Sequence, residues 1–160
     1  MRKFIVQAIL LLLVAGGALF LFKSPADINV PFVPEKTIVR SIEINNAKIT
    51  AEIANSQAKR RKGLSGRAAL ASDEGMLFVF EESGKYPFWM KGLNFPLDFI
   101  WIKGDKVTEV LENVAPPAPG QRDEDLPIYQ SKEDVDKVLE VSAGTAQKFN
   151  IKAGDTVKIE

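Results

Sequence analysis

Short apolar runs bounded by turn residues constrain the fold of this chain more than any other feature. From residue 37 onward, β-branched and aromatic residues gather in runs too short for a helix, and these runs end at Gly, Asn, Asp or Pro. Such runs are typical of β-strands. We therefore predict strands over residues 37–44, 48–53, 76–80, 86–91, 97–103, 106–112, 137–141 and 156–159.

Turn signals indicate how neighbouring strands connect. Asn45-Asn46 is predicted to join the first two segments as a hairpin, and Gly104-Asp105 forms a tight turn after residue 103. Residues 92–96 are predicted to make a second hairpin from segments 86–91 and 97–103. Residues 115–125 carry three prolines and a run of acids, and this composition predicts a surface loop.

Helical patterns are confined to short segments. A helix over residues 56–62 is predicted to begin at the cap residue Ser56 and to end at Gly63. A further turn is predicted over 66–71, and one or two turns over 143–150. So few helical residues beside eight short strands predict a mainly β domain, as a sandwich or barrel rather than a parallel α/β sheet.

The N-terminus carries a different signal. Residues 4–22 are apolar except for Gln7, and as a helix of 19 residues they would span about 28 Å, close to the ~30 Å hydrocarbon core of a bilayer. We predict an N-terminal transmembrane helix within a membrane anchor at residues 1–23. A cleaved signal peptide with its site at residues 16–18 is the alternative, and the protein would then be secreted.

Flanking charges predict the orientation of this anchor. Arg2, Lys3 and the terminal amine outnumber Lys23, so the N-terminus is expected in the cytoplasm and the domain outside it, in the periplasm or the extracellular space. Residues 24–36 contain three prolines and are predicted to be an extended tether. A single mainly β domain is then expected over residues 37–160.

Missing residue types exclude several kinds of chemistry. The chain has no His and no Cys, which excludes Ser–His and Cys–His nucleophiles and the usual zinc sites. We predict neither a cofactor nor a metal site. Three of the 21 basic residues flank the apolar run, so the rest of the chain has 18 basic residues against 21 acidic ones. This balance does not favour nucleic acid as a partner.

Charged clusters leave other possibilities open. Residues 59–62 (KRRK) and Arg67 form a basic cluster, interpreted either as a solvated helix face or as a site for an anionic lipid surface or ligand. The acids at 73–74 and 123–125 lack the alternating ligands and central glycine of a calcium loop. Nothing in the sequence indicates that two of these carboxylates face each other across a cleft, as glycoside hydrolysis requires.

Asp98 interrupts the most apolar segment of the domain. In a strand over 97–103 it shares a face with Ile100 and Ile102, so it is predicted to be buried and to need a partner. Two interpretations stay open: a carboxylate that pins local structure, or a ligand-binding or catalytic carboxylate beside Trp89 and Met90. The candidate partners are Lys91, Arg61, Arg67 or backbone N–H groups of residues 92–96.

Five sequence blocks occur in an order that resembles a known family. They are RKGLSGRAAL at 61–70, GMLFVF at 75–80, FWMK at 88–91, PLD at 96–98, and VLE at 138–140 with Gly144. Together they resemble the prokaryotic "domain of unknown function 192" family from about Ile49 to the C-terminus. The resemblance implies a compact sandwich of jelly-roll type, and relatives that often carry an N-terminal signal or anchor. It implies no activity, because the family has none assigned.

The resemblance also marks individual positions. Carried over by motif, the ligand-binding candidates are Arg61, Arg67, Trp89, Met90, Lys91 and Asp98, and the structural positions are Gly63, Leu64, Gly75 and Met76. The sequence departs from the family pattern at Ser65, where Met is common, and at Gly92-Leu93, where Asn-Thr usually follows the lysine. A ligand contact made by that Asn-Thr pair in relatives would be lost or altered here.

Three functional hypotheses follow. The leading one is a membrane-anchored extracytoplasmic binding or accessory module for a small polar ligand, an envelope polymer or a partner protein. The first alternative is a hydrolase that uses Asp98 with Lys91 or Arg67. The second is a purely structural or interaction domain whose function lies in the loop at residues 116–125.

Overall fold

A computed structural model describes residues 36–160 of the chain. The predicted anchor at 4–22 and nearly all of the predicted tether lie outside these residues. Within the described part, no helix is long and apolar enough to cross a membrane.

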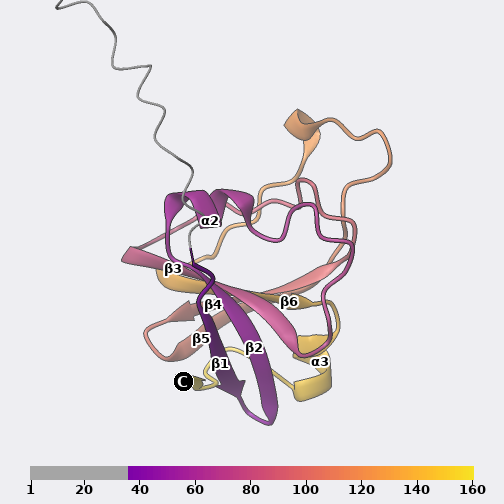
Figure 1. Ribbon diagram of the computed structural model, residues 1–160. Helices are drawn as coiled ribbons and strands as arrows, with labels where there is room; N and C mark the ends of the chain where they lie inside the picture. Colours follow the sequence, from indigo (N-terminus) through magenta and orange to yellow (C-terminus); the bar gives the residue numbers. More distant parts are fainter. Residues whose placement is uncertain (1–35) are drawn as a thin grey trace, which may run out of the picture. The chain divides into compact units, whose positions relative to one another are not determined.

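Seven strands form one sheet, and each corresponds to a predicted strand (Figure 1). Their order across the sheet is β5-β4-β6-β3-β2-β1-β7, and all neighbours are antiparallel except β2 and β3. The strands are β1 (Val39–Ile44), β2 (Ala47–Ala54), β3 (Glu74–Gly84), β4 (Leu97–Lys103), β5 (Lys106–Val114), β6 (Val135–Ser142) and β7 (Val157–Ile159).

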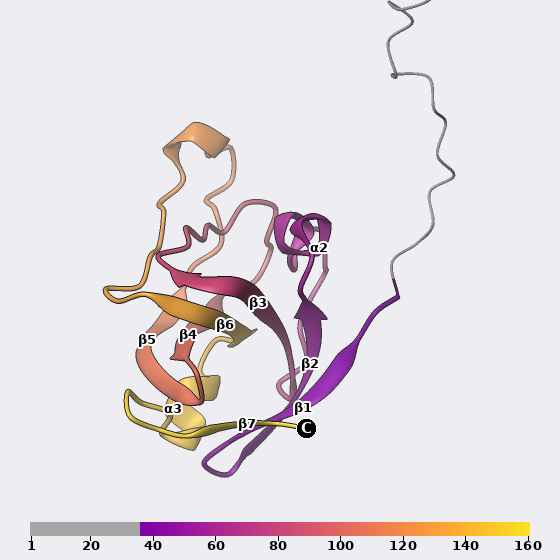
Figure 2. The same ribbon diagram turned by 90° about the vertical axis from the view of Figure 1, so that its left-hand side faces the viewer.

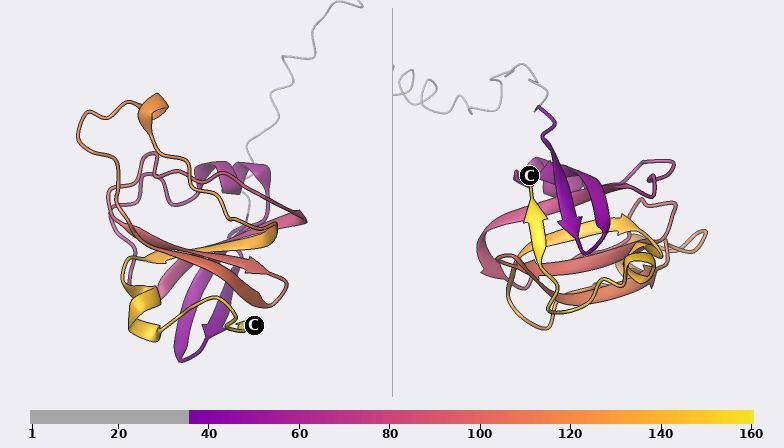
Figure 3. Two further views of the ribbon diagram at one scale, coloured as in Figure 1. Left: turned by 180° about the vertical axis from the view of Figure 1, so that it is seen from behind. Right: turned by 90° about the horizontal axis from the view of Figure 1, so that it is seen from below.

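The sheet curls until its two edges meet. β7 pairs with β1, and the residues just before β7 reach β5 through an antiparallel bridge between Lys106 and Thr156. The N–H of Val107 donates to the carbonyl of Asp155 at 2.9 Å. Figure 2 and the right panel of Figure 3 show β7 beside β1 at this closure. The mainly β prediction is confirmed, but the strands make one curled sheet and not a two-sheet sandwich.

Each face of the sheet carries its own core. The inner cluster receives side chains from all seven strands, including Ile42, Leu77 and Ile100. The outer cluster lies on β3, β4 and β6 and is covered by the connections at 63–73 and 85–96. β4 contributes to both, because Ile100 points inward while Phe99 and Trp101 point outward.

The helices are short. α2 (Gln57–Lys62) begins after Ser56, whose Oγ accepts a hydrogen bond from the N–H of Lys59, and it ends at Gly63 as predicted. α3 (Thr145–Phe149) confirms the helix predicted within 143–150. The helical turn predicted over 66–71 is wrong, because residues 67–71 follow the turn at Gly66 as an irregular connection. A 3₁₀ turn, η2 (Asp123–Asp125), lies in the proline-containing loop.

The strand predicted over 86–91 is wrong, and the hairpin built on it is wrong as well. Phe88 and Met90 are buried and Trp89 is exposed, so the alternation is real. The segment has no neighbouring strand along its length. It makes a single bridge, in which Phe88 and Tyr129 exchange two backbone hydrogen bonds of 2.8 Å. It therefore covers the outer core as an extended connection.

These connections gather on one side of the sheet. α2, the covering connections and the loop around η2 lie together at the top of Figure 1, and the reverse view at the left of Figure 3 agrees. α3 lies at the opposite end. This arrangement leaves the outer face of β3 and β6 beneath α2, where the candidate site is found.

Candidate functional site

A cavity of about 150 Å³ lies beneath the C-terminal half of α2. We call it the α2 pocket and define it by the residues that line it. Basic residues of α2 contribute to the lining, and aromatic residues of β3 and of the connection after β3 form much of the wall. The lining residues are Arg60, Arg61, Lys62, Gly63, Leu64, Ser65, Phe78, Phe80, Tyr86, Pro87, Phe88, Trp89, Leu93 and Glu140.

Glu140 is the only carboxyl among these residues. On β6, Leu139 and Val141 point into the inner core, so Glu140 points to the outer face together with Val138. Only 4% of the residue is exposed. Its side chain forms no hydrogen bond or ion pair with any residue from 36 to 160. Burial raises the pKa of the carboxyl to about 8, so the group is mostly neutral at pH 7.

The basic residues of α2 differ in how they are engaged. The guanidinium of Arg60 donates to the carbonyl of Val79 at 2.9 Å and lies 5.3 Å from the ring centre of Phe80. The exposed guanidinium of Arg61 makes no hydrogen bond or ion pair within the described residues. Lys62 is also exposed. Arg60, Arg61 and Lys62 line the same pocket as Glu140, but none of them forms an ion pair with its carboxyl.

Ring contacts hold the aromatic wall in place. Phe80 and Tyr86 stack with centroids 3.5 Å apart and planes 5° from parallel. Phe78 and Phe88 meet edge to face at 5.1 Å. Trp89 is 52% exposed, although it follows the buried Phe88 directly. The pocket thus has an apolar, preformed wall with one large exposed ring beside it.

The structure brings some of the predicted site residues together. Arg61 and Trp89 both line the α2 pocket, as do Gly63 and Leu64 from the structural motif. Gly63 ends α2 with a positive φ of 50°, a conformation that glycine adopts without strain. The other predicted ligand-binding residues do not line the pocket.

Arg67, Met90 and Lys91 are engaged elsewhere. Arg67 pairs with Glu52 at 2.7 Å, and this hydrogen bond, with a smaller effect from the charge of Lys62, lowers the pKa of Glu52. Met90 is buried in the outer core, in which Met76 also packs. The ammonium of Lys91 pairs with Asp123 at 2.6 Å on the surface.

Asp98 lies on the other face of the sheet and is fully buried. Its Oδ1 accepts a hydrogen bond of 2.8 Å from the N–H of Asn113, and its Oδ2 accepts one of 2.9 Å from the N–H of Ala146. The predicted need for a partner is confirmed. The partners are backbone groups of β5 and α3, and not Lys91, an arginine or the 92–96 turn. Asp98 therefore pins structure, and no cation of the hydrolase hypothesis contacts it.

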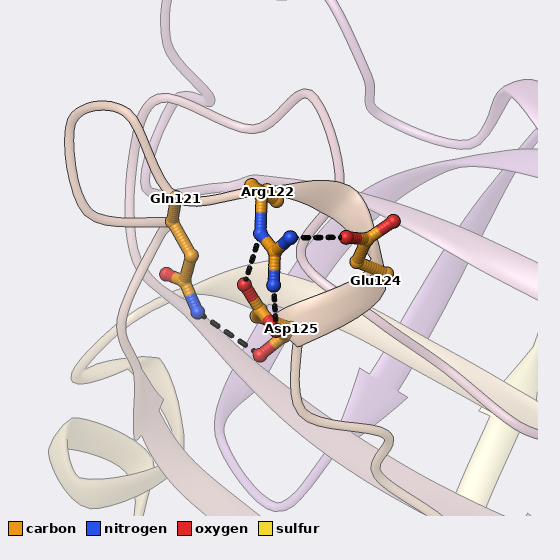
Figure 4. Close-up of polar contacts among 4 residues, drawn as sticks. All are labelled: Gln121, Arg122, Glu124 and Asp125. Carbon is orange, nitrogen blue, oxygen red and sulfur yellow. Dashed lines mark hydrogen bonds and ion pairs between the residues drawn. The ribbon is translucent and has the colours of Figure 1, made fainter.

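The acids of the loop around η2 pair with basic side chains. Arg122 contacts Glu124 at 2.6 Å and both carboxylate oxygens of Asp125, at 2.8 and 3.1 Å (Figure 4). Gln121 adds a hydrogen bond of 3.2 Å to the backbone carbonyl of Asp125. Because Asp123 pairs with Lys91, this loop is tied to the connection that covers the outer core.

The two departures from the family pattern touch each other. Ser65 Oγ donates to the carbonyl of Lys91 at 2.7 Å, and the N–H of Gly66 donates to the carbonyl of Gly92 at 2.9 Å. A Cβ at position 92 would lie 3.2 Å from the Cβ of Ser65. A small residue at 92 therefore accompanies this close approach of the two connections.

Sequence reasoning missed Glu140 as a site residue. Glu140 is the last residue of the VLE block at 138–140. The available signal was the one used for Asp98: a carboxylate within an apolar strand of alternating faces. Which loop covers that face could not be read from the strand itself.

The fold and the site together define a class of protein: a small curled-sheet domain with a preformed pocket on the outer face of its sheet. The chain belongs to the DUF192 family, described as "Uncharacterized ACR", whose sequence profile matches residues 38–159. This match confirms the resemblance drawn from the five blocks.

The solved structures that are similar to this chain include two from bacteria. A Sinorhizobium meliloti 1021 protein, provisionally described as a transcription regulator, is 28% identical over 79% of this chain and 98% of its own, with a TM-score of 0.70. A protein of unknown function from Novosphingobium aromaticivorans DSM 12444 is 27% identical over 80% of this chain and 89% of its own, with a TM-score of 0.65. No curated protein shows significant similarity in sequence.

Proposed function

We propose that the domain is a binding module that holds a small polar ligand in the α2 pocket. The observation that carries this proposal is the carboxyl of Glu140, which is buried in the pocket and has no partner among residues 36–160. Buried polar groups in folded proteins are nearly always hydrogen-bonded, because an unmade hydrogen bond costs about 1–3 kcal/mol. A ligand that bonds to Glu140 would supply the missing partner.

The size of the pocket limits the ligand. Pockets that bury drug-sized molecules measure roughly 300–1,000 Å³, whereas this one measures about 150 Å³. A small metabolite or the end group of a longer chain fits the volume. Hydrolysis is less well supported than binding, because the lining contains a single carboxyl and Asp98 lies on the opposite face.

The membrane placement is also a proposal. We propose that residues 1–23 anchor the chain and present the domain outside the cytoplasm, as the apolar run at 4–22 and its flanking charges support. The full chain is expected in the membrane fraction, and a chain that begins at residue 24 in the soluble fraction. Protease added to intact spheroplasts should digest the domain. Protection of the full chain from that protease would reverse the orientation.

DNA binding, which the provisional description of the S. meliloti protein suggests, is less well supported here. Helical readers place a recognition helix in the major groove. α2 has only six residues, and three of its basic side chains line the pocket. The basic residues therefore fit a small anionic group better than a groove of duplex DNA.

Ligand binding can be tested with small molecules of different charge as probes. The full chain, purified in a nonionic detergent, is titrated with propylamine, butyrate, 4-aminobutyrate and propanol while melting temperature and tryptophan emission are recorded. A ligand that binds only the folded state raises the melting temperature. We expect at least one probe to do so and to change the emission of Trp89.

Two variants localise the response. Trp89→Phe should abolish the emission change, since the remaining Trp101 is buried outside the pocket lining. The phenyl ring keeps an aromatic side chain in the lining, so the thermal shift should remain. Arg40→Gln, a surface change on β1, should leave both responses intact. If no probe shifts the melting temperature or the emission at millimolar concentration, the binding proposal is wrong.

A further inference from the structure

We infer that the ligand is a small zwitterion whose ammonium group contacts Glu140 and whose anionic group contacts Arg61 and Lys62. This inference rests on the proposed binding function and adds the chemical class of the ligand. It follows from a carboxyl and two basic side chains that line one pocket without pairing with each other, and from the aromatic wall of the same pocket.

The carboxyl of Glu140 favours a cation. No described residue hydrogen-bonds or pairs with it, so its hydrogen-bond partner, and the opposite charge once it loses its proton, have to come from the ligand. The pocket also contains the rings of Phe78, Phe80 and Phe88. Aromatic faces attract ammonium groups, most strongly when water is excluded. A carboxylate within an aromatic wall is therefore suited to a primary ammonium.

The basic part of the pocket favours an anion. Arg60 is already bonded to a backbone carbonyl and stacked on Phe80, but Arg61 has no such partner in the described part of the chain. Lys62 adds a second exposed charge beside it. A carboxylate or phosphate would gain charge-assisted hydrogen bonds from these donors. A simple amine would contact the carboxyl but leave the basic side chains without an anionic partner.

Ammonium binding should be coupled to loss of a proton. The titratable or charged groups that line the pocket with Glu140 are Arg60, Arg61 and Lys62 from α2 and Tyr86 from the connection after β3. The residues paired with Glu140 on β3 and β4, Met76 and Phe99, do not titrate. Because burial raises the pKa of Glu140 to about 8, ammonium binding at pH 7 should release about 0.9 proton.

A matched set of probes tests the inference on the full chain in detergent. ω-Amino acids from glycine to 6-aminohexanoate are compared with alkylamines and alkylcarboxylates of the same length, by calorimetry and by Trp89 emission. At the best length, the amino acid should bind at least tenfold more tightly than either single-charge probe. Calorimetry in buffers of different ionisation enthalpy should report proton release for the amino acid and the amine, but not for the carboxylate.

Two substitutions assign the ends of the ligand. Glu140→Gln should weaken the binding of the amino acid and of the amine at least tenfold and abolish proton release. The affinity for the carboxylate should stay unchanged. Arg61→Gln should weaken the binding of the amino acid and of the carboxylate, but not the binding of the amine. Glu112→Gln and Arg40→Gln are the matched controls on exposed strand positions, and both should bind as the wild type does.

The outcomes separate this inference from the proposed function. If carboxylates or neutral probes bind but amines do not, or if Glu140→Gln binds the amino acid as tightly as wild type, the zwitterion inference is overturned and the pocket remains a binding site. If no probe of any charge binds, the proposed function and the inference both fail.

Discussion

Two buried carboxyls on neighbouring strands show how local surroundings decide what a residue does. Asp98 on β4 pairs with Val141 on β6, and Glu140 is the residue next to Val141. Asp98 points inward and accepts two backbone hydrogen bonds. Glu140 points outward into a pocket and accepts none from the described residues. Burial is costly for both groups, but only the first has its cost offset within the fold.

Asp98→Asn should destabilise the protein by about 2–3 kcal/mol, because an amide oxygen can accept one of the two N–H groups while the amide NH₂ faces the other. Urea denaturation followed by circular dichroism measures this change. Lys91→Ala is the comparison: its surface pair with Asp123 is half-exposed, so we expect a loss of less than about 1 kcal/mol. Equal losses in the two variants would contradict the assignment of Asp98 to backbone donors.

Glu140 should make stability depend on pH. Its pKa is about 8 in the folded state, against 4.5 for the unperturbed group. Between these two pH values the folded protein binds the proton of Glu140 more tightly than the unfolded chain does. The stability that this proton contributes is therefore complete below pH 4.5, falls as pH rises and is lost above pH 8. Glu140→Gln should match the wild type at pH 5 and be more stable at pH 8.5, by about 2–4 kcal/mol.

Melting curves from pH 5 to 9 measure this difference. In Glu112→Gln the melting temperature should depend on pH as it does in the wild type, because the side chain of Glu112 is exposed. If the melting temperatures of wild type and Glu140→Gln change in parallel with pH, the carboxyl has the same pKa in the folded and the unfolded chain.

Structure is predictable from this sequence where one residue pattern decides the outcome. Alternation along 97–103 placed Asp98 on a buried face, and the Ser56 cap with Gly63 set the limits of α2. The donors to Asp98 come from residues 15 and 48 positions away. Which distant backbone groups approach a strand depends on the order of strands in the sheet, and no local pattern contains that order.

At the scale of elements, β3 shows how a glycine permits close packing. β3 lies between β2 and β6, and Gly75 pairs with Ala51 and Val141. A Cβ at position 75 would lie 2.7 Å from the backbone carbonyl oxygen of Glu140 and 3.2 Å from Ile49 and Val141. The strand that carries Glu140 therefore depends on this glycine for its position.

Gly75→Ala should destabilise the protein by about 1–3 kcal/mol, since the added methyl group forces strands apart. Gly84→Ala on the same strand is the matched control, because its Cβ would meet only Tyr86 at an ordinary 3.4 Å. We expect that variant to stay within about 0.5 kcal/mol of wild type. Thermal denaturation distinguishes the two, and equal melting temperatures would show that β6 can move to accommodate the methyl group.

Residues 86–91 show where element prediction from sequence fails. Their alternation matched a strand because Phe88 and Met90 are buried against the outer core. A covering connection and a strand bury alternate residues in the same way, and they differ only in whether a neighbour supplies a hydrogen-bond ladder. That neighbour is missing here except at Tyr129.

For the whole molecule, closure of the sheet depends on a last strand of three residues. β7 pairs with β1, and the residues before it bond to β5, so both edges are covered at once. Open edges with unpaired backbone groups promote association between chains. Closure therefore protects the domain from aggregation as well as completing its inner core, to which Val157 contributes.

Deletion of residues 156–160 should expose both edges and remove Val157 from the core. We expect a large drop in melting temperature, together with oligomers or aggregates in size-exclusion chromatography. Lys158→Ala, a change of an exposed side chain on β7, should elute and melt as wild type does. A deletion variant that elutes as wild type does would show that the other six strands suffice.

The same closure has a kinetic consequence. Ile42 pairs with Ile159, so the contact that seals the sheet joins residues 117 positions apart in the chain. Domains dominated by such long-range pairings fold slowly, on a scale of about milliseconds to seconds, because the entropy of ordering the intervening chain is lost before the contact forms. The inner core is therefore enclosed late, and a refolding experiment should find β1–β7 pairing among the last events to be completed.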